Sequence, residues 1–309
     1  SAANSGKTPV NSSGRTDMNG ISLKAYGKVN LGLDVTGKRS DGYHLVKMIM
    51  QTVDVWDDIK ITAMDYGGYT GKISISCDHP EVPSDDKNLA YKAADMICRR
   101  YDLKNEIHID IKKKIPMAAG MAGGSADAAA VIEGMDQLFR LGMSAAQKDE
   151  TALLLGADVP FCLRRGTYLA EGIGEKLIQL PDLMHCFMVI VKPQISVSTA
   201  WAYKELDAMM ESSRESVIHP DIDALMQAVK DGDLTGMTEN MGNILELPVL
   251  KRYEEINSIK EKLTGLGAKC ALMSGSGSAV FGIFPEKENA DRAFKCIDGG
   301  SYGKFEVEF

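Results

Sequence analysis

The chain has 309 residues, and its 35 lysine and arginine residues are outnumbered by 43 aspartate and glutamate residues, which gives a formal net charge of −8. This acidic balance argues against a nucleic-acid binder and against a basic membrane-surface protein, because both require an excess of positive charge. No apolar run approaches the roughly 18–20 residues of a membrane-spanning helix, and the length predicts either one large domain or two.

The N-terminal segment and the cysteines give two further expectations. Residues 1–17 are almost all small or polar and lack the apolar core of a signal peptide, so we interpret them as a disordered leader or tag remnant. The six cysteines are scattered, with no C-x-x-C pair. This spacing predicts free thiols in a reducing cytoplasm and no structural zinc site.

Strand patterns open the first half of the chain, and helices follow. Runs of β-branched and apolar residues predict strands over 22–35, 45–55, 59–63, 72–77, 162–170 and 175–179. Alternate isoleucines at Ile107, Ile109 and Ile111 predict a half-exposed strand over 106–115. Helical spacing of apolar residues predicts helices over 88–101, over 144–155, and between them a strong helix that Gly142 can end.

The second half mixes strands and helices irregularly. We expect strands over 186–191, 269–273, 279–284 and 304–309, and helices over 198–210, 222–230, 250–263 and just before the last strand. This order favours an α+β fold over a doubly wound parallel sheet. A break at Leu180-Pro181-Asp182 predicts two domains, 18–180 and 181–309.

The most informative stretch is a run of small residues from Pro116 to Ala128, between a predicted strand and the strong helix. Small residues let backbone N–H groups approach an anion, and the helix directs its positive end there. Ser125 would either cap the helix or reach a phosphate or metal. A Walker A loop needs G-x-x-x-x-G-K-S/T, and Gly6-Lys7-Thr8 in the leader is its only partial match. The G-x-G-x-x-G fingerprint is also absent, so the run predicts another kind of phosphate cradle.

Three segments in this order resemble the motifs of the GHMP kinases: Ala25-Tyr26-Gly27-Lys28-Val29-Asn30-Leu31, residues 116–128 and residues 272–282. Within that family, Asp41-Gly42-Tyr43-His44 and Leu155-Gly156-Ala157-Asp158-Val159-Pro160 resemble the 4-diphosphocytidyl-2-C-methyl-D-erythritol kinases. The similarity runs from about Lys24 to the C-terminus.

The resemblance implies a two-domain α+β fold, with an N-terminal ribosomal protein S5 domain 2-like part and a C-terminal ferredoxin-like part. It places the active site in the interdomain cleft. The γ-phosphate of ATP would pass to the C2 hydroxyl of a cytidine diphosphate alcohol, a step of the non-mevalonate route to isoprenoid precursors. By the family pattern Asp158 is the catalytic base, and Lys28 keeps it ionised and lends positive charge to the transferring phosphoryl group.

For ATP, the resemblance implies contact with Pro116, Met117, Ala118, Ala119, Gly120, Met121, Ala122, Gly123, Gly124, Ser125 and Ala126, and with Asn88 and Lys113 near the adenine. A Mg²⁺ ion is expected with it, with ligands unknown. Asp127, in the first helical turn, would either help to hold that ion or point away.

For the second substrate, the resemblance implies contacts from Asn30, Tyr43, His44, Thr199 and Tyr203. Tyr43 offers an aromatic face, His44 a ring and a backbone that can pair with the cytosine edge, and Tyr203 a second stacking face. The glycines around Ser276 fit both a hairpin turn and a loop that helps to close the site.

Two alternative functions are compatible with the same fold. Another small-molecule GHMP kinase, of the mevalonate or homoserine type, would have no reason to carry the Tyr43-His44 pair. A non-catalytic ligand sensor would be expected to lose Lys28 or Asp158, and both are present. The expected partners are therefore small molecules, with no nucleic acid and no membrane, for a cytoplasmic monomer or weak homodimer.

Overall fold

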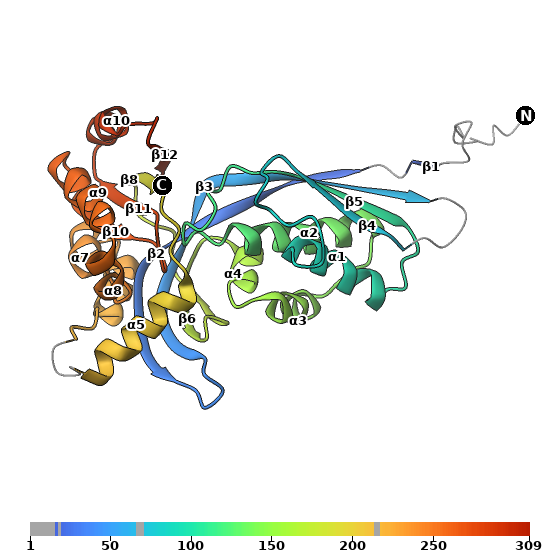
Figure 1. Ribbon diagram of the computed structural model, residues 1–309, viewed down its shortest axis with the longest axis horizontal. Coiled ribbons are helices and arrows are strands. Elements are labelled where there is room, and N and C mark those ends of the chain that lie inside the picture. Colours follow the sequence, from blue (N-terminus) through green and yellow to red (C-terminus); the bar gives the residue numbers. More distant parts are fainter. Residues whose placement is uncertain (1–15, 18–19, 66–70, 213–216) are drawn as a thin grey trace, which may run out of the picture. The chain divides into compact units, whose positions relative to one another are not determined.

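The computed structural model describes residues 16–17, 20–65, 71–212 and 217–309 (Figure 1). Most of the leader predicted for 1–17 lies outside the described residues. Its last two residues form strand β1 (Thr16–Asp17), which pairs antiparallel with the end of β3 (His44–Asp65).

The chain divides into two compact units, each assembled from separate stretches of sequence. Unit 1 comprises Ser1–Ala25, Asp57–Lys114 and Gly124–Leu163, as far as these are described, and unit 2 comprises Tyr26–Trp56, Ile115–Gly123 and Arg164–Phe309. Strands β2 (Ile21–Lys38) and β3 contribute residues to both units. A domain boundary near residue 180 stays a prediction, because these units follow spatial contacts and not one break in the chain.

Unit 1 places helices on one face of its part of a mixed sheet (Figure 1). Besides parts of β2 and β3, its elements are β4 (Ile73–Cys77), β5 (Glu106–Lys112), α1 (Leu89–Arg100), α2 (Gly123–Phe139), α3 (Ala145–Leu155) and α4 (Val159–Arg164). Strand β5 pairs antiparallel with β3 and parallel with β4. Its alternate isoleucines are completely buried, so the strand predicted from their spacing is confirmed.

Side-chain caps explain where two helices of unit 1 begin. The Asn88 Oδ1 accepts a hydrogen bond from the backbone N–H of Ala90 at 2.8 Å, and α1 starts at the next residue. Ser144 and Gln147 form a reciprocal capping box at the start of α3. The helices predicted to begin at residues 88 and 144 are therefore confirmed.

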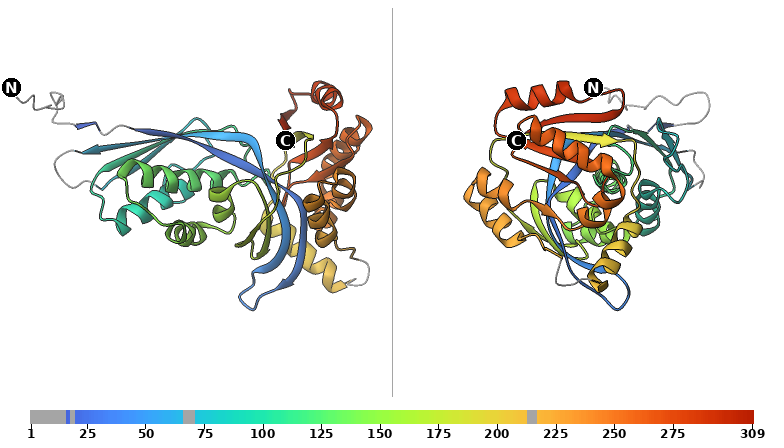
Figure 2. Two further views of the ribbon diagram at one scale, coloured as in Figure 1. Left: turned by 180° about the vertical axis from the view of Figure 1, so that it is seen from behind. Right: turned by 60° about the vertical axis from the view of Figure 1, so that its left-hand side comes forward.

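Unit 2 contains a second, wholly antiparallel sheet. Its order is β10 (Cys270–Met273), β11 (Val280–Phe284), β8 (Phe187–Pro193) and β12 (Tyr302–Glu308). Helices α9 (Glu254–Gly265) and α10 (Lys287–Cys296) pack against this sheet (Figure 2). The apolar residues of β8 and β11 are buried and form the core of this part of the unit.

The remaining elements of unit 2 lie between these strands in the sequence. They are β6 (Thr167–Gly172), β7 (Lys176–Gln179), α5 (Thr199–Ser212), α6 (Ile222–Asp231), α7 (Leu234–Asn240), β9 (Gly242–Asn243) and α8 (Glu246–Arg252). Strand β6 pairs with β3 and β7, and β9 pairs with β2. Across the described residues of both units, every helix is too short or too polar to cross a membrane.

The largest errors in predicted boundaries concern four elements. The strands expected over 45–55 and 59–63 are one strand, β3, because the buried Asp57 between them receives hydrogen bonds from Lys113 and Lys114 and does not interrupt it. Residues 162–164 belong to α4 and not to a strand. The single helix expected over 250–263 is two helices, α8 and α9, separated at Tyr253, whose ψ of 79° is not helical.

Candidate active site

The Gly-rich loop, residues 116–122, is tied to a second loop within unit 2. The carbonyl oxygens of Ala118 and Ala119 accept hydrogen bonds from the backbone N–H groups of Ser278 and Ala279, each at 3.2 Å. These carbonyls are therefore bound by the protein, and the shape of the loop is set by the fold.

Gly120 has a packing reason to be glycine. Its φ is +72°, in the left-handed region, and an added Cβ would lie 2.0 Å from the carbonyl oxygen of Ser274. Ala118 and Ala122 also have positive φ values, of 47° and 57°. The small residues of the loop are thus required by its positive φ angles and close packing, independently of any role in binding an anion.

Three motifs that are far apart in the sequence meet around Ser274. Its Oγ donates to the carbonyl oxygen of Gly120 at 3.0 Å and accepts from the backbone N–H of Asn30 at 3.3 Å. The backbone N–H of Lys28 donates to the carbonyl oxygen of Met121 at 3.1 Å. The structure therefore brings together Lys28, Asn30 and the Gly-rich loop within unit 2.

The side chains of Lys28 and Asn30 are buried next to each other. Alternate positions on β2 place them on the same face of the strand. The Lys28 Nζ donates to Asn30 Oδ1 at 2.7 Å, and the Asn30 amide group contacts the Met48 sulfur at 3.2 Å. Lys28 is 5% exposed, so its positive charge is held in a fixed place with little water around it.

The Gly-rich loop runs directly into α2, which begins at Gly123. The first turn is made of small residues, Gly124, Ser125 and Ala126. An added Cβ at Gly124 would approach only Leu89, at an ordinary contact distance of 3.9 Å. Space thus remains beside the N-terminal end of α2, where backbone N–H groups and the helix dipole favour an anion.

Asp158 belongs to unit 1 and immediately precedes α4. Its carbonyl oxygen accepts from the backbone N–H of Cys162 at 3.1 Å, which makes it the residue that opens this short helix. The residue is half-buried. Lys28 lies in the other unit, so the pairing of these two residues stays a prediction.

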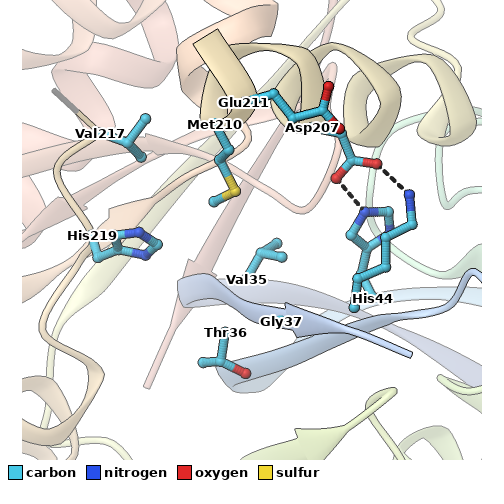
Figure 3. A pocket seen from close by; sticks show the side chains of 10 residues that line it. Val35, Thr36, Gly37, His44, Asp207, Met210, Glu211, Val217 and His219 are labelled. Atoms are coloured by element: carbon cyan, nitrogen blue, oxygen red, sulfur yellow. Dashed lines mark hydrogen bonds and ion pairs between the residues drawn. The ribbon is translucent and has the colours of Figure 1, made fainter. Parts of the chain in front are cut away.

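Lys38, Asp207 and His44, which we call the cavity cluster, are joined by hydrogen bonds in unit 2 (Figure 3). The Asp207 carboxylate accepts from Lys38 Nζ at 2.6 Å and contacts His44 Nε2 at 2.7 Å. The His44 ring stacks on Tyr203, with ring centres 4.6 Å apart. Two of the residues predicted for the base pocket, His44 and Tyr203, are therefore in contact, whereas Tyr43 is 60% exposed.

The cavity cluster borders a cavity of about 510 Å³ (Figure 3). Its walls come from the end of β2, from α5 and from residues near the start of α6, including Val35, Met210 and His219. Partial burial pushes the pKa of the Asp207 carboxyl upward, but the hydrogen bonds from Lys38 and His44 outweigh it and hold that pKa below its usual value. Asp207 is thus a hydrogen-bond acceptor at neutral pH.

Thr199 lies against the loop between β10 and β11. Its Oγ1 is 2.8 Å from the Oγ of Ser276, so the start of α5 and this loop are connected. Asn243 also holds this loop, because its Nδ2 donates to the carbonyl oxygens of Met273 and Gly275 at 2.8 and 2.7 Å. The turn after β10 therefore connects two strands of a hairpin and is also held in place by hydrogen bonds with Thr199 and Asn243.

Asn88 and Lys113 have structural partners in unit 1. Besides its cap, Asn88 donates from Nδ2 to the carbonyl oxygen of Pro83 at 2.8 Å. Lys113 Nζ donates to Asp57 at 2.5 Å and to Asp127 at 2.9 Å, and we call these three residues the buried cluster. Both side chains thus have hydrogen-bond partners within the protein. Their contact with adenine stays a prediction.

Burial governs the charges of the buried cluster. It raises the pKa of the Asp127 carboxyl to about 7, against the opposing effect of the Lys113 ammonium. Burial also tends to lower the pKa of Lys113, but Asp127 and Asp57 outweigh it and raise that pKa. The lysine therefore remains charged, while one of the carboxylates is easily protonated.

Asp127 does not fit a magnesium site. Its Oδ2 faces Lys113, and its Oδ1 is buried without a hydrogen-bond partner, whereas Mg²⁺ keeps several water molecules in its coordination shell. In the described ranges, no group of three or more His, Cys, Asp or Glu side chains could hold a metal ion. The Mg²⁺ ion stays a prediction to which no residue of this chain is assigned.

The sequence reasoning missed three residues that organise these sites: Asp207, Ser274 and Asn243. For Asp207 a signal existed, because it lies four positions after Tyr203 on a helix and so shares a face with it. Ser274 lies within residues 272–282, but only the glycines of that segment suggest a role from the sequence. Asn243 lies in a two-residue strand that no pattern predicted.

Two family models match this chain. The model described as "GHMP kinases N terminal domain" matches residues 88–166, and that described as "GHMP kinases C terminal" matches residues 223–299. A protein of Acetivibrio thermocellus named 4-diphosphocytidyl-2-C-methyl-D-erythritol kinase is 45% identical over 288 residues, which cover 93% of this chain and 98% of the relative.

Solved structures are similar over nearly the whole chain. A crystal structure of 4-(cytidine 5'-diphospho)-2C-methyl-D-erythritol kinase has a TM-score of 0.75 and 28% identity, covering 93% of this chain and 98% of the other. The homoserine kinase from Cytophaga hutchinsonii has a TM-score of 0.71 and 18% identity, covering 94% and 95%. The second likeness shows a shared fold only.

Proposed function

We propose, because this chain belongs to the GHMP kinases and among them to the 4-diphosphocytidyl-2-C-methyl-D-erythritol kinases, that it transfers the γ-phosphate of ATP to the C2 hydroxyl of 4-diphosphocytidyl-2-C-methyl-D-erythritol. This reaction is a step of the non-mevalonate route to isoprenoid precursors. The observation that carries the proposal is the meeting of Lys28, Asn30 and the Gly-rich loop around Ser274.

Phosphoryl transfer needs positioning and neutralisation of charge more than covalent help from the protein. The bond between the γ-phosphorus and the bridging oxygen of ATP breaks, a bond to the C2 oxygen forms, and ADP leaves. Asp158 accepts the proton of the attacking hydroxyl. Lys28, buried and fixed by Asn30, stabilises the negative charge of the transferring group.

The Gly-rich loop and the start of α2 hold the phosphates of ATP in this proposal. Four consecutive loop residues, Ala118 to Met121, have carbonyl oxygens that accept hydrogen bonds from the protein. Such carbonyls are turned away from an anion, which is then free to meet backbone N–H groups and the positive end of the helix. At the other substrate, His44 and Tyr203 contact the cytosine.

The proposal includes a cytoplasmic location and small-molecule partners only, with the protein acting as a monomer or weak homodimer. All six cysteines are free thiols, which supports a reducing compartment.

A coupled ADP-release assay with the purified protein tests the reaction. The cytidine diphosphate alcohol should support turnover, and mevalonate and homoserine should not. Turnover that is fastest with either of these two would overturn the proposed substrate. Binding of the nucleotide alcohol without ADP release would point to a ligand sensor instead.

The role of Asp158 is tested in the same assay. Asp158→Asn should lower kcat by about 10²–10⁴-fold, the usual contribution of a general base, with little change in the KM for ATP. Asp182→Asn, an exposed aspartate in the segment before β8, is the matched control and should leave kcat unchanged. A near-normal kcat for Asp158→Asn would exclude it as the base.

A further inference from the structure

Asp207 holds His44 in one orientation through two different contacts. A carboxylate oxygen lies 2.7 Å from His44 Nε2, and the other carboxylate oxygen accepts from Lys38 Nζ at 2.6 Å (Figure 3). The flat face of the His44 ring rests on Tyr203. With one edge bonded and one face stacked, the ring has little freedom to turn.

This geometry determines which ring nitrogen carries the proton. An ionised carboxylate can only accept hydrogen bonds, and the pKa of Asp207 lies below its usual value. A separation of 2.7 Å between two acceptors would be repulsive, so Nε2 must carry the hydrogen. In a neutral imidazole the other nitrogen, Nδ1, is then an acceptor.

An acceptor nitrogen distinguishes the two pyrimidines. Cytosine presents an amino group, a donor, at the position where uracil presents a carbonyl oxygen, an acceptor. Only the amino group can donate to Nδ1. A uracil in the same place would leave two acceptors facing each other, which costs far more than a hydrogen bond that is merely lost.

We infer that Asp207, braced by Lys38, is a positioning residue that fixes the Nε2–H tautomer of His44 and thereby makes the site select cytosine over uracil. The inference rests on the proposed function, in which the cytosine lies at His44. The cavity of about 510 Å³ beside the ring is large enough for a nucleoside to reach it.

The test measures the affinities of CDP and UDP by calorimetry, for the wild type and for Asp207→Asn. The amide both accepts and donates, so it permits both tautomers of His44 while keeping the shape of the side chain. The wild type should prefer CDP by at least about tenfold, and the variant should lose most of this preference, chiefly by gaining affinity for UDP.

Two matched variants separate this effect from general damage to the cavity. Glu211→Gln changes a carboxylate one helical turn further along α5 that lines the same cavity, and it should retain the preference for CDP. Lys38→Met removes the brace but leaves the carboxylate on His44, and it should retain most of the preference.

A second measurement needs no variant. The ¹⁵N NMR signals of His44 should show protonated Nε2 and unprotonated Nδ1 in the wild type, and a mixture of both tautomers in Asp207→Asn. A wild-type ring protonated at Nδ1 would overturn the inference, and so would full CDP preference in Asp207→Asn. A wild type that binds CDP and UDP equally would instead overturn the proposed base site itself.

Discussion

The buried cluster and the cavity cluster each contain one lysine, but they differ in the ratio of positive groups to carboxylates and in how exposed these groups are. In the buried cluster, Lys113 is 4% exposed and shares its charge between Asp57 and Asp127, which are 0% and 4% exposed. In the cavity cluster, the lysine and the histidine share a single carboxylate, that of Asp207, and the lysine is half exposed.

The two clusters are therefore suited to different roles. Burying three ionisable groups costs several kcal/mol for each ion and is compensated only while every partner is in place. The buried cluster is therefore suited to joining β3, α2 and the segment that follows β5, and poorly suited to releasing Lys113 to a ligand. The cavity cluster, whose side chains are partly exposed, can present a ring nitrogen to a ligand at small cost to the fold.

Loss of the buried lysine should change stability the most. Lys113→Met should lower the free energy of unfolding by about 3–5 kcal/mol, because it leaves two buried carboxylates without their cation. Urea unfolding monitored by circular dichroism measures this change.

The neighbouring lysine supplies the control. Lys114 is 50% exposed and pairs with Asp58 at 2.9 Å, so Lys114→Met should cost less than about 1 kcal/mol. If the two methionine variants were equally stable, the buried cluster would not hold unit 1 together, and a role for Lys113 at the adenine would gain support.

A smaller effect follows from the charge of Asp127. In the folded protein the pKa of its carboxyl is about 7, whereas in the unfolded chain it is near 3.9. Between these values the folded state binds the additional proton, so the contribution of Asp127 to the free energy of unfolding falls as pH rises from 4 to 7. Asp127→Asn lacks this titration and should gain about 2 kcal/mol relative to the wild type between pH 5 and pH 8.

Denaturant unfolding at several pH values between 5 and 8 measures this difference. Asp95→Asn, which removes a more exposed carboxylate of α1 that pairs with Arg99, should follow the wild type across the same range. A constant gap between wild type and Asp127→Asn would mean that Asp127 stays ionised in the folded state.

Much of the fold could be predicted from the sequence, because interactions between residues close in sequence determine where many strands and helices form. The alternate isoleucines of β5 and the capping residues Asn88 and Ser144 act within a few positions of the elements that they define. The errors came where distant residues decide. The strands expected over 45–55 and 59–63 leave out Asp57-Asp58, whereas hydrogen bonds from Lys113 and Lys114, more than fifty positions away, hold Asp57 inside a continuous β3.

In the candidate site, too, features set by nearby residues could be predicted, whereas those set by distant residues could not. The motifs around Lys28 and Gly120 could be read from the sequence, but the reason that Gly120 must be glycine is the backbone of Ser274, 154 positions away. The helical spacing puts Asp207 on the same face as Tyr203, but it does not reveal which groups the carboxylate contacts. Its importance depends on the hairpin between β2 and β3, which brings Lys38 and His44 to it.

The smallest expected effect tests the cavity cluster. Lys38→Met should change the free energy of unfolding by less than about 1 kcal/mol, because the lysine is half exposed. Loss of its hydrogen bond should raise the pKa of Asp207 toward the usual value, which a ¹³C NMR titration of the carboxyl carbon measures. In the wild type, the stability that comes from the lowered pKa is present above about pH 4 and is lost as pH falls through that pKa.

The difference in stability between the wild type and Lys38→Met should accordingly be greatest near neutral pH and should shrink in acid. Lys47→Met is the matched control, since Lys47 pairs with a different exposed carboxylate, Asp223, and should leave the Asp207 titration unchanged. A loss of several kcal/mol in Lys38→Met would remove the contrast with the buried cluster, because the fold would then depend on both lysines alike.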